Sequence, residues 1–217
     1  MNKIEALLFD MDGVVLNSNP LHREAWTEYN RRHGIATTPE MRLRISGKRN
    51  DEVVRDFFGA SLSDEEVMSH GRAKEALYRS LMGDRLPAAI VPGIEAFLAR
   101  HGNFKTALVT NAEPANVNFV LDGSGLRRYF DAVVTGDDVQ LPKPHPAIYL
   151  RAAELLRVMP GECVVFEDSP IGAAAALAAG MRLVGIATSE RDLAGASLMI
   201  ADFTEPSLET WLESGRC

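Results

Sequence analysis

The stretch Ala6-Leu7-Leu8-Phe9-Asp10-Met11-Asp12-Gly13-Val14-Val15 decides how the rest of this 217-residue sequence can be interpreted. A short apolar run that a glycine ends is typical of a strand buried on both faces of a parallel sheet. Side chains alternate along a strand, so Asp10 and Asp12 can face the same crevice at its carboxyl end, where open α/β sheets bind ligands. The plain alternative is a strand followed by an ordinary Asp-Gly turn.

Composition narrows the class of protein. Hydrophobic residues make up 46% of the chain and charged residues 24%, as in a soluble globular protein of one large domain or a core domain with an insertion. The net charge of −7 and the lack of a long basic block argue against a nucleic-acid partner. No apolar run is long enough to span a membrane. The oligomeric state cannot be read from composition, and a monomer is compatible with it.

The expected location is the cytoplasm. The N-terminus, Met-Asn-Lys-Ile-Glu, has no basic segment followed by an apolar core, so no signal peptide is expected. Cys163 and Cys217 have neither the spacing of a zinc site nor that of a disulfide framework, which fits a reducing compartment.

The pattern along the chain changes near Ile90. From about Leu16 to Arg85 the periodicity predicts helices and no strands, and a capping-box pattern at Ser63 and Glu66 predicts the start of one of them. Beyond Ile90, strands and helices alternate, with strands expected at 106–110, 132–135, 163–168, 183–187 and 198–200. Alternation of this kind predicts parallel strands with right-handed crossovers. We expect an α/β fold: a Rossmann-like, doubly wound parallel-sheet core (residues 1–15 and 86–217) with an inserted small α-helical bundle (residues 16–85).

Polar residues follow four of the expected strands. Since the carboxyl ends of parallel strands meet along one edge of the sheet, these side chains should converge on a single crevice; they are Asp10, Asp12, Thr110, Asn111, Lys143, Glu167 and Asp168. Several carboxylates close together would repel one another unless a metal joined them. Oxygen ligands alone favour Mg²⁺.

Each of these groups has a role if the substrate is a phosphate ester. A carboxylate can attack phosphorus, while a lysine and Mg²⁺ offset the charge of two anions brought together. A hydroxyl and a backbone N–H can hold the phosphoryl oxygens. A second carboxylate can move protons, which typically contributes about 10²–10⁴-fold to the rate.

Four segments carry a resemblance to a known family. Asp10-Met11-Asp12-Gly13, Val109-Thr110-Asn111, Pro142-Lys143-Pro144 and Phe166-Glu167-Asp168-Ser169 resemble, in order and spacing, the four motifs of the haloacid dehalogenase-like superfamily of phosphohydrolases. The helical insertion after the first motif resembles the helical cap of the subgroup that holds β-phosphoglucomutase and many small-molecule phosphatases. The resemblance covers nearly the whole chain.

The resemblance implies a role for each motif residue. Asp10 would be the nucleophile and Asp12 the general acid/base. Asp10, the Asp12 backbone carbonyl and Asp168 would hold Mg²⁺, with Glu167 in support. The phosphoryl group would be held by Thr110, the Asn111 backbone and Lys143.

Three residues of the helical insertion are candidates for substrate contact. His22 lies in the first turn of the first helix, where many relatives carry a histidine, and could sense closure of the cap or contact Asp12. Lys48 and Arg49 form a cationic loop that could bind an anionic or hydroxyl-rich leaving group. Ordinary solvated side chains are the alternative interpretation for all three.

The leading hypothesis is a Mg²⁺-dependent phosphatase for a small phosphomonoester such as a sugar phosphate. A β-phosphoglucomutase-type phosphomutase uses the same chemistry, although the segment Thr110–Pro114 looks more like a phosphatase version. A signalling receiver domain also uses an acid, a threonine and a lysine around Mg²⁺, but its phosphoacceptor follows a later strand and its chain is about half as long. In a binding module without activity, we would not expect every catalytic position to be filled.

Overall fold

The structure is a computed structural model that describes residues 3–45 and 50–215. The chain divides into two compact units. The sheet unit comprises Met1–Asn17 and Pro87–Cys217, and the helical unit comprises Ser18–Leu86.

The sheet unit is built on a six-stranded sheet in the order β3-β2-β1-β4-β5-β6, in which every neighbouring pair is parallel. Its strands are β1 (Ala6–Phe9), β2 (Lys105–Val109), β3 (Ala132–Val134), β4 (Cys163–Glu167), β5 (Arg182–Ile186) and β6 (Leu198–Ile200). The chain runs outward from β1 to β3, returns to the other side of β1 and runs outward again to β6. This confirms the predicted doubly wound α/β fold. The strand order reverses between β1 and β4, where such sheets form a crevice.

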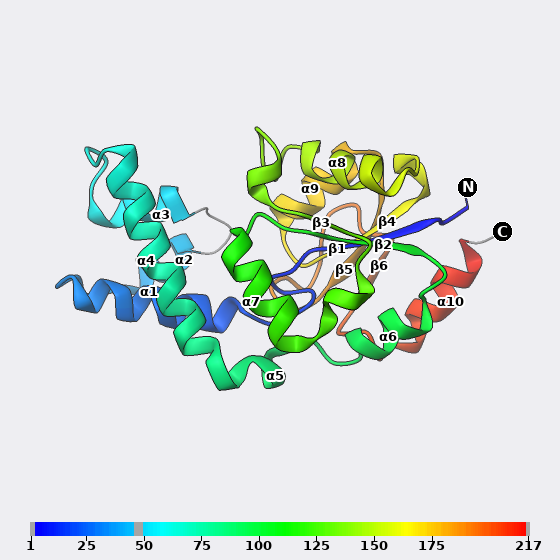
Figure 1. The fold of residues 1–217 in the computed structure, drawn as a ribbon, viewed down its shortest axis with the longest axis horizontal. Helices are drawn as coiled ribbons and strands as arrows, with labels where there is room; N and C mark the ends of the chain where they lie inside the picture. The colour runs from blue at the N-terminus through cyan, green and yellow to red at the C-terminus, as the bar shows by residue number, and fades with distance from the viewer. Residues whose placement is uncertain (1–2, 46–49, 216–217) are drawn as a thin grey trace. The chain divides into compact units, whose positions relative to one another are not determined.

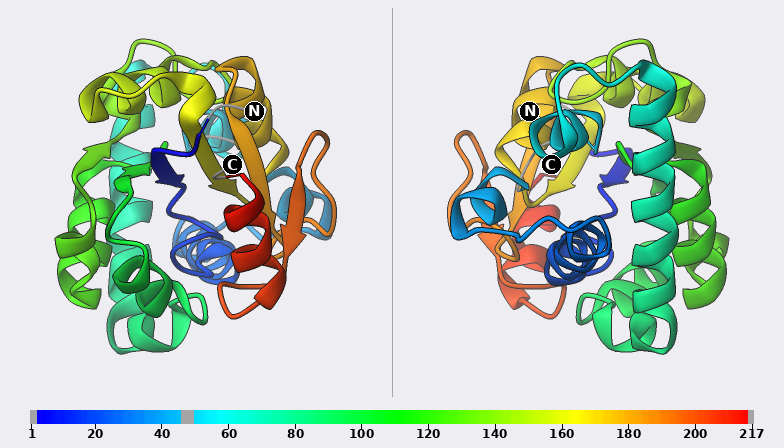
Figure 2. Two further views of the ribbon diagram at one scale, coloured as in Figure 1. Left: turned by 90° about the vertical axis from the view of Figure 1, so that its right-hand side faces the viewer. Right: turned by 90° about the vertical axis from the view of Figure 1, so that its left-hand side faces the viewer.

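Helices cover both faces of the sheet. They are α6 (Ile94–Arg100), α7 (Pro114–Ser124), α8 (Ala147–Leu156), α9 (Pro170–Ala178) and α10 (Pro206–Ser214). α8 and α9 lie on one face, and α6 and α10 lie on the other (Figures 1 and 2). The sequence analysis did not anticipate α10. Shorter helical turns are η1 (Gly83–Arg85), α5 (Leu86–Ala89), η2 (Leu126–Tyr129), η3 (Gly136–Asp138) and η4 (Pro160–Glu162).

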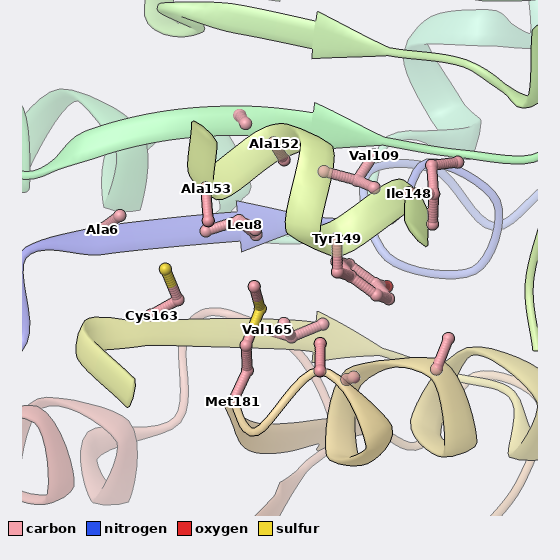
Figure 3. Packing of buried hydrophobic residues seen from close by; sticks show 14 of the residues in the cluster. Ala6, Leu8, Val109, Ile148, Tyr149, Ala152, Ala153, Cys163, Val165 and Met181 are labelled. Atoms are coloured by element: carbon pink, nitrogen blue, oxygen red, sulfur yellow. The ribbon is translucent and has the colours of Figure 1, made fainter. Parts of the chain in front are cut away.

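Alternation along β1 gives the sheet two different cores. Leu8 belongs to an aliphatic cluster that includes side chains of α8 and α9 (Figure 3). Phe9 points to the opposite face, where it stacks on Phe166 with ring centroids 4.7 Å apart and packs edge-on against Phe97. All four residues of β1 are buried, so the strand cannot slip by one residue without exchanging the two cores.

The helical unit contains α1 (Asn19–Arg32), α2 (Pro39–Ile45), α3 (Asn50–Phe58) and α4 (Asp64–Met82). Its core comprises Trp26, Tyr29, Ile45, Val53, Val54, Val67 and Leu77. The predicted capping box is confirmed, because Glu66 N donates to Ser63 Oγ and Ser63 N donates to a Glu66 carboxylate oxygen. Among the described residues, no helix has the length and apolarity needed to cross a membrane.

Candidate active site

The sheet register brings the first and fourth motifs together. β1 pairs with β4, so that Phe9 lies opposite Phe166, and the ladder continues as Asp10 N donates to Phe166 O at 3.0 Å. Asp10 therefore leaves β1 beside Glu167, the last residue of β4. On the other side of β1, Thr110 directly follows β2. Three of the predicted residues thus meet at one edge because their strands end there.

Lys143 lies at the centre of this edge. Its ammonium donates to Asp10 Oδ1 at 2.8 Å, to Glu167 Oε1 at 2.7 Å and to the Val109 carbonyl at 2.8 Å. An ammonium has three N–H donors, so these three acceptors satisfy it completely. The residue is buried, and a buried ammonium requires such partners. Burial by itself would lower the pKa of Lys143, but the negative charges of Asp10 and Glu167 raise it by more. The pKa of Lys143 therefore lies above its ordinary value.

The Asn111 side chain holds in place the loop that carries Lys143. The Lys143 backbone N–H donates to Asn111 Oδ1 at 3.1 Å, and Asn111 Nδ2 donates to the Lys143 carbonyl at 3.3 Å. This pair of bonds is a role for the Asn111 side chain that the sequence analysis did not foresee. Thr110 is buried beside it, and its Oγ1 accepts from Ala112 N at 3.1 Å.

Glu167 is fully buried, and both of its carboxylate oxygens accept several hydrogen bonds. Oε1 accepts from Lys143 and from the Tyr149 hydroxyl at 2.9 Å. Oε2 accepts from the backbone N–H groups of Asp168 and Ser169, at 3.1 and 3.3 Å, and from Ser169 Oγ at 3.0 Å. Its oxygens therefore hold the neighbouring groups in place.

Asp168 is bound by hydroxyls that follow β5. Ser189 Oγ donates a short hydrogen bond to Asp168 Oδ2, and Thr188 Oγ1 lies 3.3 Å from the same oxygen. Thr188 Oγ1 also lies 2.6 Å from the Gly13 carbonyl, which links the Asp168 loop to the turn after β1. Gly13 has φ +83°, and a Cβ at this position would overlap the Asp168 carboxylate. Two independent constraints therefore require glycine in the first motif.

Asp12 is half-buried in that turn, in an isolated bridge with Leu16. Gly13 N donates to Leu16 O at 2.7 Å and thereby closes the turn. The structure thus places Asp12 two residues beyond Asp10, between β1 and the first helix.

Charges of one sign are crowded at this edge. Oxygens of the Asp10, Glu167 and Asp168 carboxylates all lie within 4.8 Å of one another. Burial raises the pKa of Asp10 well above its ordinary value; Lys143 opposes this increase, while Glu167 and Asp168 add to it. Burial, followed by the charge of Glu167, raises the pKa of Asp168 to about 7. Such a set of oxygen donors fits a hard divalent cation such as Mg²⁺, which would relieve the repulsion.

The helical unit contains a second buried charge cluster. Lys74 and Glu75 form an ion pair with both side chains buried, and Asn50 Nδ2 donates to Glu75 Oε1 at 2.5 Å. His22 belongs to this cluster: its Nδ1 lies 3.3 Å from Lys74 Nζ, and its ring stacks on Tyr78 at 3.9 Å. Lys48 and Arg49 lie outside the described residues.

Sequence reasoning missed several residues that the structure shows in these clusters, among them Lys74, Glu75, Ser189 and Tyr149. Lys74 and Glu75 share the buried stripe of α4 with Gly71 and Tyr78, so adjacent opposite charges on a core-facing stripe were the available signal. Ser189 could have been found by extending the inspection of strand ends to the fifth strand. Tyr149 had no such signal, since a tyrosine on the apolar face of a helix indicates core packing.

Comparisons with known proteins match most of the chain. Residues 4–180 match the family model described as haloacid dehalogenase-like hydrolase. The fructose-1-phosphate phosphatase YqaB of Escherichia coli K12 is 34% identical over 180 residues, which cover 83% of this chain and 95% of the relative. The phosphorylated carbohydrates phosphatase of Thermotoga maritima is 33% identical, over 87% of this chain and 88% of the relative. The crystal structure of β-phosphoglucomutase from Clostridium difficile superposes with a TM-score of 0.84 at 29% identity, covering 98% of this chain and 97% of that one.

Proposed function

Since this chain belongs to the haloacid dehalogenase-like hydrolases and is a phosphoric monoester hydrolase, we propose that it is a Mg²⁺-dependent phosphatase that works through an aspartyl-phosphate on Asp10. Its substrate is a small phosphomonoester, of the sugar-phosphate class. The names of the two phosphatase relatives support this class, since one is a fructose-1-phosphate phosphatase and the other acts on phosphorylated carbohydrates.

The observation that carries the proposal is the contact between Asp10 and Lys143. The buried ammonium holds one Asp10 oxygen at 2.8 Å and so orients the carboxylate at the carboxyl edge of the sheet. The second Asp10 oxygen attacks phosphorus, and the P–O bond to the leaving alcohol breaks. Lys143 offsets part of the negative charge that builds up when a carboxylate approaches a phosphoryl group.

Proton transfer falls to Asp12. As a carboxylic acid it donates its proton to the leaving oxygen, and as a carboxylate it then takes a proton from the attacking water. That water forms the new P–O bond, inorganic phosphate leaves and the Asp10 carboxylate is regenerated. Thr110 Oγ1 and the Asn111 backbone N–H are assigned to the phosphoryl oxygens.

The residues that would hold Mg²⁺ are Asp10, the Asp12 backbone carbonyl and Asp168, with Glu167 in support. When bound, the cation supplies charge neutralisation at the phosphoryl group. Ser189 and Thr188 orient the Asp168 carboxylate for this purpose. Mutation of a residue that hydrogen-bonds a metal ligand typically weakens metal affinity by about 10–100-fold.

The choice of substrate is assigned to the helical unit as a cap, with His22, Lys48 and Arg49 as the residues that meet the leaving group. A phosphomutase is the second candidate, because the fold matches β-phosphoglucomutase closely. The mutase returns the phosphoryl group to a sugar phosphate instead of passing it to water.

The test is hydrolysis of p-nitrophenyl phosphate with Mg²⁺ and with EDTA, in the wild type and in Asp10→Asn. We expect metal-dependent turnover that Asp10→Asn abolishes, while Asp122→Asn, a control in an exposed ion pair with Arg127, keeps it. Turnover that survives Asp10→Asn would rule out the aspartyl-phosphate.

A panel of sugar phosphates, including fructose 1-phosphate, then ranks substrates by kcat/KM. Conversion of β-glucose 1-phosphate to glucose 6-phosphate with a trace of the bisphosphate would favour the mutase.

A further inference from the structure

Tyr149 is the one tyrosine that the described structure places against the Asp10–Lys143–Glu167 cluster. It lies in the first turn of α8 and is fully buried. Figure 3 shows its side chain extending from α8 towards the carboxyl ends of β1 and β4. The same helix face carries Ile148, Ala152 and Ala153, which pack in the aliphatic core.

Both parts of the side chain engage the charged cluster. The hydroxyl donates to Glu167 Oε1 at 2.9 Å, and this is the same oxygen that binds Lys143. The Lys143 ammonium also lies over the tyrosine ring, 4.9 Å from its centroid. A desolvated cation at this distance from a ring is stabilised by the ring quadrupole. Tyr149 thus contacts the ammonium directly through its ring and indirectly through the carboxylate that anchors it.

A purely structural role does not account for the hydroxyl. Burying a hydroxyl in an aliphatic core costs free energy unless it finds an acceptor, and phenylalanine would fill the same space without this cost. Here the acceptor is an anion already bound to Lys143. The hydroxyl occupies a second acceptor position of Glu167 Oε1, so its removal would change the balance of forces on the ammonium between Glu167 and Asp10.

We propose that Tyr149 is a positioning residue for the reaction, one that fixes the Lys143 ammonium against Asp10 through its ring and through Glu167. This inference rests on the proposed function, in which Lys143 offsets charge at the phosphoryl group. That charge is greatest in the transition state, so displacement of the ammonium lowers kcat more than it raises KM.

Tyr149→Phe tests the hydroxyl alone, because it keeps the ring and its volume. With p-nitrophenyl phosphate and Mg²⁺, we expect kcat to fall about ten- to hundred-fold, as for loss of a hydrogen bond to a charged group, with KM changed less than about three-fold. Tyr149→Leu also removes the ring, so its kcat should be lower than that of Tyr149→Phe. The matched control is Tyr29→Phe in the helical unit, which loses a hydroxyl contact of 2.9 Å to His70 and should keep kcat within about two-fold. Melting temperatures identify any variant that fails to fold.

A kcat of Tyr149→Phe equal to that of the wild type, or a loss no larger than that of the control, overturns the proposal.

A double-mutant cycle gives a second readout. Calorimetric binding of orthovanadate, a phosphoryl transition-state mimic, needs no turnover, and Tyr149→Phe should weaken it less in a Lys143→Met background than in the wild type. Equal losses in the two backgrounds, or no loss in the wild type, overturn the role through Lys143. If the wild type lacks turnover, the proposed function fails, and vanadate binding alone decides the role of Tyr149.

Discussion

Lys143 Nζ lies 2.8 Å from Asp10 Oδ1, although 133 positions separate the two residues in the sequence. Neither is stable alone at this depth, because an isolated buried charge is strongly disfavoured. Glu167 completes the arrangement by accepting from the same ammonium. The cluster is therefore a structural ion network, and in the proposed mechanism it also contains the nucleophile, Asp10, and orients it.

Replacement of Lys143 by methionine should destabilise the chain by about 3–5 kcal/mol at pH 8, because two buried carboxylates lose their counter-charge. The loss should be smaller at pH 5. Without Lys143 the pKa of Asp10, already raised by burial, rises further, so at low pH the carboxyl is protonated and carries no uncompensated charge. Urea unfolding at the two pH values measures the difference. The control is Lys105→Met, which removes an exposed side chain whose ammonium donates to the Leu156 carbonyl. It should cost less than about 1 kcal/mol at both pH values. An equal loss at pH 5 and pH 8 for Lys143→Met would contradict the prediction.

Gly13→Ala should damage the site far more than its backbone strain explains. Gly13 and Gly180 both have positive φ, +83° and +74°, but only at Gly13 would a Cβ meet the Asp168 carboxylate. Gly180→Ala should cost about 1 kcal/mol of stability and leave turnover intact. Gly13→Ala should in addition weaken Mg²⁺ affinity and kcat/KM by about ten-fold or more, since Asp168 is displaced. Magnesium titration of turnover for both variants provides the comparison, and similar titration curves would refute the clash.

Binding of Mg²⁺ should depend on pH through Asp168. Its pKa of about 7 lies above the ordinary 3.8, so the metal-free site retains a proton at pH 6 that the cation must displace. The apparent affinity should therefore rise up to about ten-fold per pH unit below pH 7 and level off near pH 8. Calorimetry in buffers of different ionisation enthalpy measures both the affinity and the proton released. A flat affinity between pH 5.5 and 8.5 would show that Asp168 is already ionised.

The helical unit should lose stability when Glu75 is neutralised. Burial by itself would raise the pKa of Glu75, but the charges of Lys74 and His22 outweigh it and lower the pKa to about 2. Because the folded value lies below the ordinary 4.5, the ion pair contributes on the order of 3 kcal/mol above pH 4.5, and this is lost as the pH falls towards 2. Glu75→Gln should therefore differ most from the wild type near pH 7 and progressively less below pH 4.5. Chemical denaturation across this range tests it, with exposed Glu65→Gln as the control; a difference independent of pH would contradict the assigned pKa.

Much of the fold was predictable because its signals are local. The buried runs that became β1 and β4 are ended by acidic residues, and glycines and prolines mark where helices begin and end. These features depend on neighbours only a few residues away, and they predicted the parallel sheet and the helical insertion. The helix Pro206–Ser214 was missed, although it begins with a proline and Gly215 follows its last residue, both common at helix ends.

The sequence by itself therefore determined which residues stand at the ends of the strands, and from them the family; the chemistry proposed above is assigned to these same residues. Only the tertiary structure decided how those residues pair. That Asn111 binds the Lys143 backbone, that Ser189 binds Asp168 and that Tyr149 reaches Glu167 depends on strand register, on loop course and on the rotation of α8. Such pairings join residues far apart in the chain, and their stability comes from shared burial, which no local pattern records.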